Sequence, residues 1–122
     1  MSFVLLWLSV GALGGLGALA RFLLDALIST NTGARFPLGT MLVNLSGALV
    51  LGLLVGFALS GDAYLLAGTA VIGSYTTFST WMLESHRLAE DGQRWLLSAN
   101  VVLSLLLGVG AAALGRLLGG GW

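Results

Sequence analysis

The sequence predicts an all-α membrane protein built from four transmembrane helices. Hydrophobic residues make up 57% of its 122 residues and charged residues only 8%, with a mean hydropathy of +1.00, whereas a soluble domain carries about 25% charged residues. Residues 1–20, 36–61, 63–83 and 95–115 also lack Asp, Glu, Lys, Arg and His, and about 20 apolar residues cross a bilayer as a helix. We therefore expect a single transmembrane domain over residues 1–122, with spans at about 3–24, 37–60, 63–83 and 95–118. These runs are continuously apolar, and the alternation typical of a membrane β-barrel is missing.

The composition also argues against several classes of function. The net charge is zero, lysine is absent and the five arginines are scattered, so the clustered basic face that binds nucleic acid is missing. Without cysteine there are no disulfides and no thiolate metal sites. His86 is the only histidine, and no nucleophile–base pair is recognisable, so we do not expect an enzyme.

The first span is rich in glycine and ends near Arg21. Residues 18–20 (ALA) are similar to a signal-peptide cleavage site, but the basic segment that precedes such a site is missing. We therefore expect a retained first helix. Glycines spaced four residues apart predict close helix packing, because lipid provides no hydrophobic drive between helices; the pairs are Gly11 and Gly15, Gly52 and Gly56, and Gly115 and Gly119.

Neutral polar residues lie inside the second and fourth spans. Asn44 is deep in the second, and Asn100 and Ser104 share one face of the fourth because they are four residues apart. An amide in hydrocarbon costs several kcal/mol unless it is hydrogen-bonded. Such a residue either holds two helices together or lines a pore, and both interpretations remain open.

The third span contains the most informative segment, residues 73–81 (GSYTTFSTW). Four hydroxyl groups fall within the five residues 76–80, just after Gly73, so we predict that the helix is broken near its middle. Broken helices at membrane depth line cavities or binding sites. A break would free carbonyl groups for a cation and N–H groups for an anion. Trp81, which is three residues before Glu84, also fits an anchor at the membrane interface.

Three motifs together resemble the Fluc/CrcB family of fluoride channels. They are residues 14–21 (GGLGALAR), residues 39–44 (GTMLVN) and residues 76–80 (TTFST), the last followed by Glu84. Their order and spacing cover nearly the whole chain. Trp81 stands where the family has a second pore phenylalanine, and Asn100 where it usually has tyrosine.

The resemblance implies an antiparallel, dual-topology dimer in the cell inner (plasma) membrane. Such a dimer is a passive fluoride-selective channel that exports F⁻ from the cytoplasm and relieves fluoride toxicity. It also implies a structural Na⁺ at the dimer interface, held by the backbone carbonyls of Gly73 and Thr76, with Arg21 at a vestibule. By position, the fluoride pore would be lined by Asn44, Phe78, Ser79, Thr80, Trp81, Asn100 and Ser104.

The arginines bear on the partner. Four spans put Arg21, Arg35, Arg87 and Arg94 on one side of the membrane and Arg116 on the other. A dual-topology homodimer should be nearly balanced, so a paralogous second subunit is an alternative to a second copy of this chain.

Two rivals come from other classes. A small multidrug-type transporter needs a membrane-embedded carboxylate in its first helix, and this span has none. A non-conducting membrane subunit is compatible with the composition but gives the three motifs no purpose.

Overall fold

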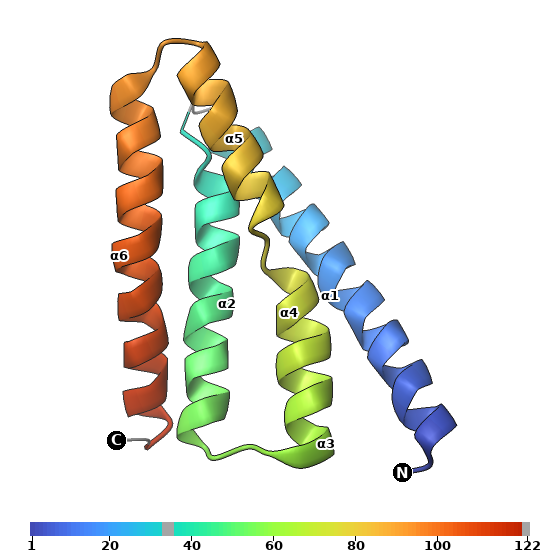
Figure 1. The fold of residues 1–122 in the computed structure, drawn as a ribbon. Helices are drawn as coiled ribbons and strands as arrows, with labels where there is room; N and C mark the ends of the chain where they lie inside the picture. Colours follow the sequence, from blue (N-terminus) through green and yellow to red (C-terminus); the bar gives the residue numbers. More distant parts are fainter. Residues whose placement is uncertain (33–35, 121–122) are drawn as a thin grey trace.

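The computed structural model describes residues 1–32 and 36–120, and all regular structure within them is helical (Figure 1). This confirms the predicted all-α class. In chain order the helices are α1 (Phe3–Thr32), α2 (Leu38–Gly56), α3 (Gly61–Tyr64), the π-helix η1 (Leu65–Ile72), α4 (Gly73–Tyr75), α5 (Ser79–Glu90) and α6 (Arg94–Leu118). Arg35, one of the four arginines predicted on one side of the membrane, lies outside the described residues.

The seven helices form four passes, and α1 is inclined to the other three (Figure 1). Three of them, α1, α2 and α6, are long and apolar enough to cross a membrane. The remaining pass is made of α3, η1 and α4 stacked end to end and continued by α5, and the start of α1 and the end of α6 lie at the same end of the bundle (Figure 1). The chain is therefore a multi-pass membrane protein whose third helix is broken, as predicted.

Glycine lets α2 and α6 pack backbone against backbone. A Cβ atom on Gly52 would collide with the Ala112 carbonyl oxygen, and one on Gly115 would collide with the Leu49 carbonyl oxygen. The same is true of the two glycines one turn further along, Gly56 and Gly119. The two predicted pairs on these helices are therefore confirmed as packing sites.

The prediction that Gly11 and Gly15 of α1 form a close helix contact is wrong within a single chain. A Cβ on Gly11 or Gly15 would meet no atom within 4 Å, because both face away from the other described helices. The close approach comes from their neighbours instead. A Cβ on Gly17 would collide with the Val71 carbonyl of η1, and one on Gly14 would lie 3.1 Å from the Ser74 hydroxyl of α4.

The third pass departs from regular α-helix twice. Residues Leu65–Ile72 wind as a π-helix, in which the Gly73 N–H donates to the Gly68 carbonyl. The helix then stops, because Thr76 is extended, with φ −81° and ψ 159°. Regular α-helix resumes at Ser79. The sequence predicted the break but not the π-helix, because the residues of the π-helix are ordinary apolar ones that give no distinctive pattern.

Candidate functional site

The break in the third pass is held by the side chain of Asn44 from α2. Its Nδ2 donates to the Thr77 carbonyl and its Oδ1 accepts from the Thr77 N–H, both at 2.8 Å. The amide thus pairs both backbone groups of Thr77, which in a continuous helix would bond residues one turn before and one turn after it. Because an amide carries two N–H donors, a second donor of Asn44 remains beside the break.

Two backbone carbonyls lose their helical partners at the break. In a continuous helix the Thr77 N–H would bond the Gly73 carbonyl and the Thr80 N–H would bond the Thr76 carbonyl. The first N–H donates to Asn44 instead, and the second donates to Thr77 Oγ1 at 3.2 Å. These are the two carbonyls that the family resemblance assigns to Na⁺, and neutral oxygen ligands suit a hard cation of that kind.

The break opens onto a groove on the outside of the chain. Its volume is about 510 Å³, and α2, η1 and the break contribute its walls. Asn44, Gly73 and Thr76 all line it. Phe78 also lines it and is 70% exposed, so a single chain leaves this part of the site uncovered.

Phe78 and Trp81 form an aromatic pair after the break. Their ring centroids are 5.7 Å apart and the rings are inclined at 76°, an edge-to-face arrangement. The Trp81 indole N–H points to α6 and donates to the Asn100 carbonyl at 3.4 Å. Edges of aromatic rings carry partial positive charge, so the pair offers electropositive edges near the groove.

Arg21 lies on the other side of the break. It lines a small cavity of about 150 Å³ together with Thr77, Thr80 and Asp25. Its Nε is buried without a hydrogen bond, and within the described residues Arg21 forms no ion pair. The structure therefore brings Arg21 and Thr80, two of the predicted site residues, to one polar cavity.

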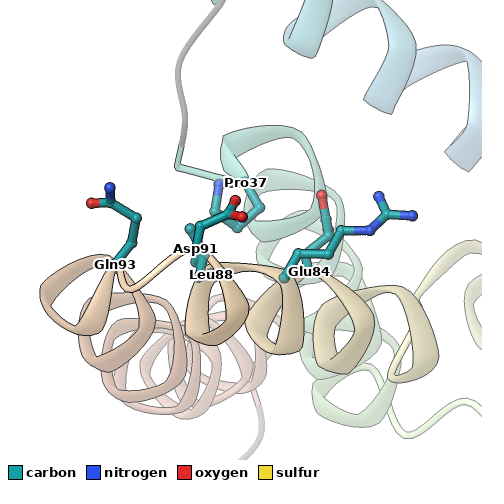
Figure 2. Close-up of a pocket in the computed structure, with 6 residues that line it drawn as sticks. Pro37, Glu84, Leu88, Asp91 and Gln93 are labelled. Carbon is teal, nitrogen blue, oxygen red and sulfur yellow. The ribbon is translucent and has the colours of Figure 1, made fainter.

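A hydrogen bond from Thr40 to Glu84 links the lining of this cavity to that of a wider pocket. Thr40 lines the small cavity, whereas Glu84 lines a pocket of about 470 Å³ near the far end of α5 (Figure 2). Asp91 lies beside Pro37 in this pocket, between Gln93 and Glu84 (Figure 2). Glu84 follows the predicted third span, and its burial raises the pKa of the carboxyl group above the ordinary value.

Asn100 and Ser104 lie on α6 in a buried polar cluster. Asn100 is 0% exposed, and its Nδ2 donates to Ser85 Oγ at 2.8 Å. Asn100 Oδ1 and Ser104 Oγ are both buried without a partner among the described residues. Ser79, by contrast, is exposed at the start of α5, 3.5 Å from the Thr77 hydroxyl.

Comparison with known proteins identifies the family. The family described as CrcB-like protein, Camphor Resistance (CrcB), matches residues 8–116. The chain belongs to the CrcB family. This confirms the resemblance that the three motifs indicated.

Several curated CrcB-family proteins are similar over almost their whole length. The chain is 51% identical over 118 residues to "Fluoride-specific ion channel FluC 2" of Mycolicibacterium paratuberculosis, covering 97% of each. It is 50% identical over 113 residues to the FluC 2 protein of Mycobacterium tuberculosis, covering 93% of this chain and 90% of the relative. "Fluoride-specific ion channel FluC 1" of Symbiobacterium thermophilum is 40% identical over 121 residues, with 94% and 98% covered.

The structure adds three residues to the site of this CrcB-family chain that the sequence did not single out. They are Thr40, Thr77 and Ser85. Spacing gave a usable signal for two of them, because Thr40 is four residues before Asn44 and Ser85 is four residues after Trp81. Residues four apart share a helix face, so this spacing places Thr40 on the face of Asn44 and Ser85 on the face of Trp81.

Proposed function

We propose that the chain forms a passive, fluoride-selective channel. The observation that carries the proposal is the break at residues 76–78, which leaves backbone and hydroxyl donors at membrane depth in a CrcB-family chain. The names of the relatives support fluoride as the ion. Ion passage through such a pore involves no covalent step, in agreement with the expectation that the chain is not an enzyme.

Neutral donors would replace the hydration shell of the ion. α5 begins at Ser79, and the N-terminal end of a helix carries partial positive charge and free N–H groups. Ser79 and Thr80 add hydroxyls, Phe78 adds a ring edge, and Asn44 adds its second N–H. A lining without a fixed positive charge holds the ion weakly enough to release it.

Arg21 would act before the pore rather than inside it. Its guanidinium faces the small cavity that Thr80 also lines. Because a fixed cation near a narrow entrance raises the local concentration of anions, Arg21 suits the vestibule role. Trp81 would contribute the second ring edge of the pathway, and Ser104 a hydroxyl on α6.

The proposed assembly is an antiparallel dimer. Phe78 and the groove beside the break are open in one chain, and a lipid-exposed gap of this kind would leave polar backbone groups without partners. A second chain seated on the groove would cover them and complete the pore. A second copy of this chain is the proposed partner, and a paralogous subunit is the alternative that the arginine imbalance raises.

The proposed dimer would hold Na⁺ at its centre. The carbonyls of Gly73 and Thr76 would bind it, because the break removes their helical N–H donors. The positive charge of the cation would offset the partial negative charge of the carbonyl oxygens at the interface and stabilise the dimer. The proposed location is the inner (plasma) membrane, with fluoride leaving the cytoplasm down its gradient.

The test is efflux from proteoliposomes made with this chain alone. Fluoride-loaded vesicles should release F⁻ much faster than protein-free vesicles, and chloride-loaded vesicles should not. Phe78→Ile should reduce fluoride release to the protein-free rate. Phe57→Ile is the matched control, because Phe57 is similarly exposed at the end of α2, away from the break.

The outcomes separate the alternatives. Fluoride release by the chain alone supports a channel made of identical subunits. Release that requires a co-reconstituted paralogue indicates a mixed dimer. If neither preparation releases F⁻ faster than empty vesicles, the proposed function is wrong and the non-conducting subunit is favoured.

A further inference from the structure

A closed set of hydrogen bonds joins α5 to α6 behind the aromatic pair. Asn100 Nδ2 donates to Ser85 Oγ at 2.8 Å, and Ser85 Oγ donates to the Trp81 carbonyl at 2.8 Å. The indole N–H of Trp81 returns to the Asn100 carbonyl at 3.4 Å. Two helices are thus tied together at three residues through both side chains and backbone.

The direction of each bond follows from the chemistry of the groups. The Trp81 carbonyl only accepts, so the single proton of the Ser85 hydroxyl is used there. Ser85 can then only accept from Asn100, which fixes the Asn100 amide with its NH₂ group toward α5. Ser85 is 5% exposed and Asn100 is 0% exposed, so water does not compete for these groups.

The cycle determines which part of Trp81 remains available to an ion. The indole N–H is occupied by the α6 backbone, and the ring is held at 76° to Phe78. Rotation of the ring would break the N–H bond inside a low-dielectric site, where an unpaired donor is costly. The ring therefore presents a fixed carbon edge toward the pathway.

We propose that Ser85 and Asn100 are positioning residues that set the orientation of the Trp81 ring and thereby the selectivity of the pore. Selectivity in this sense rests on the proposed function, whereas the orientation itself does not. Asn100 then acts through Trp81 and the α5–α6 contact, and it does not touch the permeating ion. This assigns a role to Ser85, which no sequence motif marked.

The first experiment measures ring orientation without ion flux. The chain has four tryptophans, and the Trp81 indole ¹⁵N–¹H resonance is identified by its loss in Trp81→Phe. We expect Ser85→Ala to shift that resonance upfield, as a weakened N–H hydrogen bond predicts, and to leave the other three in place. Ser85→Thr keeps the hydroxyl and should restore the wild-type position.

The second experiment measures the fluoride-to-chloride permeability ratio from reversal potentials in reconstituted bilayers. Ser85→Ala should lower the ratio by about fivefold to tenfold, the size that one lost buried hydrogen bond predicts. In a Trp81→Phe background the same substitution should have no such effect, because the indole N–H is already gone. Ser98→Ala, at an exposed position of α6, is the neutral control.

A second substitution keeps the test valid if Ser85→Ala does not fold. Asn100→Leu replaces the amide with a side chain of similar size and leaves no buried donor unpaired, and it should produce the same resonance shift. An unmoved Trp81 resonance in both variants overturns the proposal. So does an equal loss of selectivity with tryptophan and with phenylalanine at position 81. If the wild-type chain does not conduct fluoride but the resonance shifts, the positioning stands and the proposed function fails.

Discussion

The α2–α6 contact and the break in the third pass solve the same problem in opposite ways. Where α2 meets α6, side chains are removed, and glycines bring the two backbones into contact. At the break, side chains are added, and Asn44 supplies the bonds that the backbone of residues 76–78 no longer makes to itself. In the first region both helices run without interruption and their backbones are in contact. The second gives up helical bonds and gains donors and acceptors directed at a groove.

The difference shows how a short chain of apolar helices can hold a polar site. A close-packed region fixes the distance between two spans, because a backbone contact has no side chain that can adjust. The break can then depend on the single amide of Asn44, since α2 carries both that amide and the glycines that contact α6. The site is therefore held in place by the packing of α2.

The largest effect should come from adding one methyl group to the close-packed region. Gly115→Ala places a Cβ against the Leu49 carbonyl and the Leu53 amide nitrogen, and neither backbone atom can move without displacing α2. We expect a loss of about 3 kcal/mol of stability, the upper end of the usual cost of overpacking, and failure to give a monodisperse protein in detergent. Gly108→Ala on the same helix meets nothing within 4 Å and should behave as wild type in size-exclusion chromatography and thermal melting. Equal stability of the two variants would mean that the contact is not close-packed.

This contrast also marks how much could be predicted from the sequence. Spans, the break and the glycine contact of Gly52 with α6 follow from composition and spacing, since each depends on a local rule. The same four-residue spacing predicted a close helix contact at Gly11, which is absent within the described chain, and at Gly115, which is present. Only the tertiary arrangement decides which face of α1 meets a neighbour, so spacing alone could not separate them.

The site divides in the same manner. The resemblance assigned Asn44 and Phe78 to the pore, and the structure places both beside the break. The hydrogen bonds that join site residues on different helices were not predictable from the sequence. The Thr40–Glu84 and Asn100–Ser85 bonds require the rotation of α5 about its axis, which no sequence pattern specifies.

A smaller change at the break should separate its two hydrogen bonds. Asn44→Asp keeps the acceptor for the Thr77 N–H and removes the donor to the Thr77 carbonyl. The loss of that donor leaves a carbonyl unpaired, at a cost of about 1–3 kcal/mol, and adds a negative charge beside the pathway. We expect fluoride efflux to fall to the protein-free rate while the protein remains monodisperse. Efflux at the wild-type rate would show that neither the donor nor the charge state at this position matters.

A pH change should alter the charge near the Arg21 cavity and leave the close-packed α2–α6 contact unchanged. Burial and the neighbouring Asp25 raise the pKa of Glu84, while Thr40 and Arg87 oppose them. A raised carboxyl pKa means that the folded chain takes up this proton as the pH falls, at a higher pH than the unfolded chain does. The folded state therefore gains stability relative to the unfolded chain as the pH falls through the folded pKa. Loss of the negative charge should also raise the local anion concentration near Arg21.

We therefore expect fluoride flux to rise severalfold as the pH is lowered through the folded-state pKa of Glu84, after subtraction of the leak in protein-free vesicles. Glu84→Gln carries no charge at any pH and keeps a hydrogen-bond acceptor for Thr40. It should conduct at the high level throughout and remove the pH dependence. A pH profile that is the same in wild type and Glu84→Gln would exclude this carboxyl as its source.

The smallest effect should follow from a hydrogen bond that belongs to packing although it lies one residue before the break. The Tyr75 hydroxyl and Ser46 Oγ are 2.9 Å apart, joining α4 to α2. Tyr75→Phe removes one neutral hydrogen bond and leaves the ring in place, which should cost about 1 kcal/mol of stability and leave the fluoride efflux rate unchanged. Ser46 retains a bond to the Val43 carbonyl at 2.9 Å, so the substitution leaves no unpaired donor. A large loss of efflux in Tyr75→Phe would extend the functional site into α4 and end the division between a packed scaffold and a polar break.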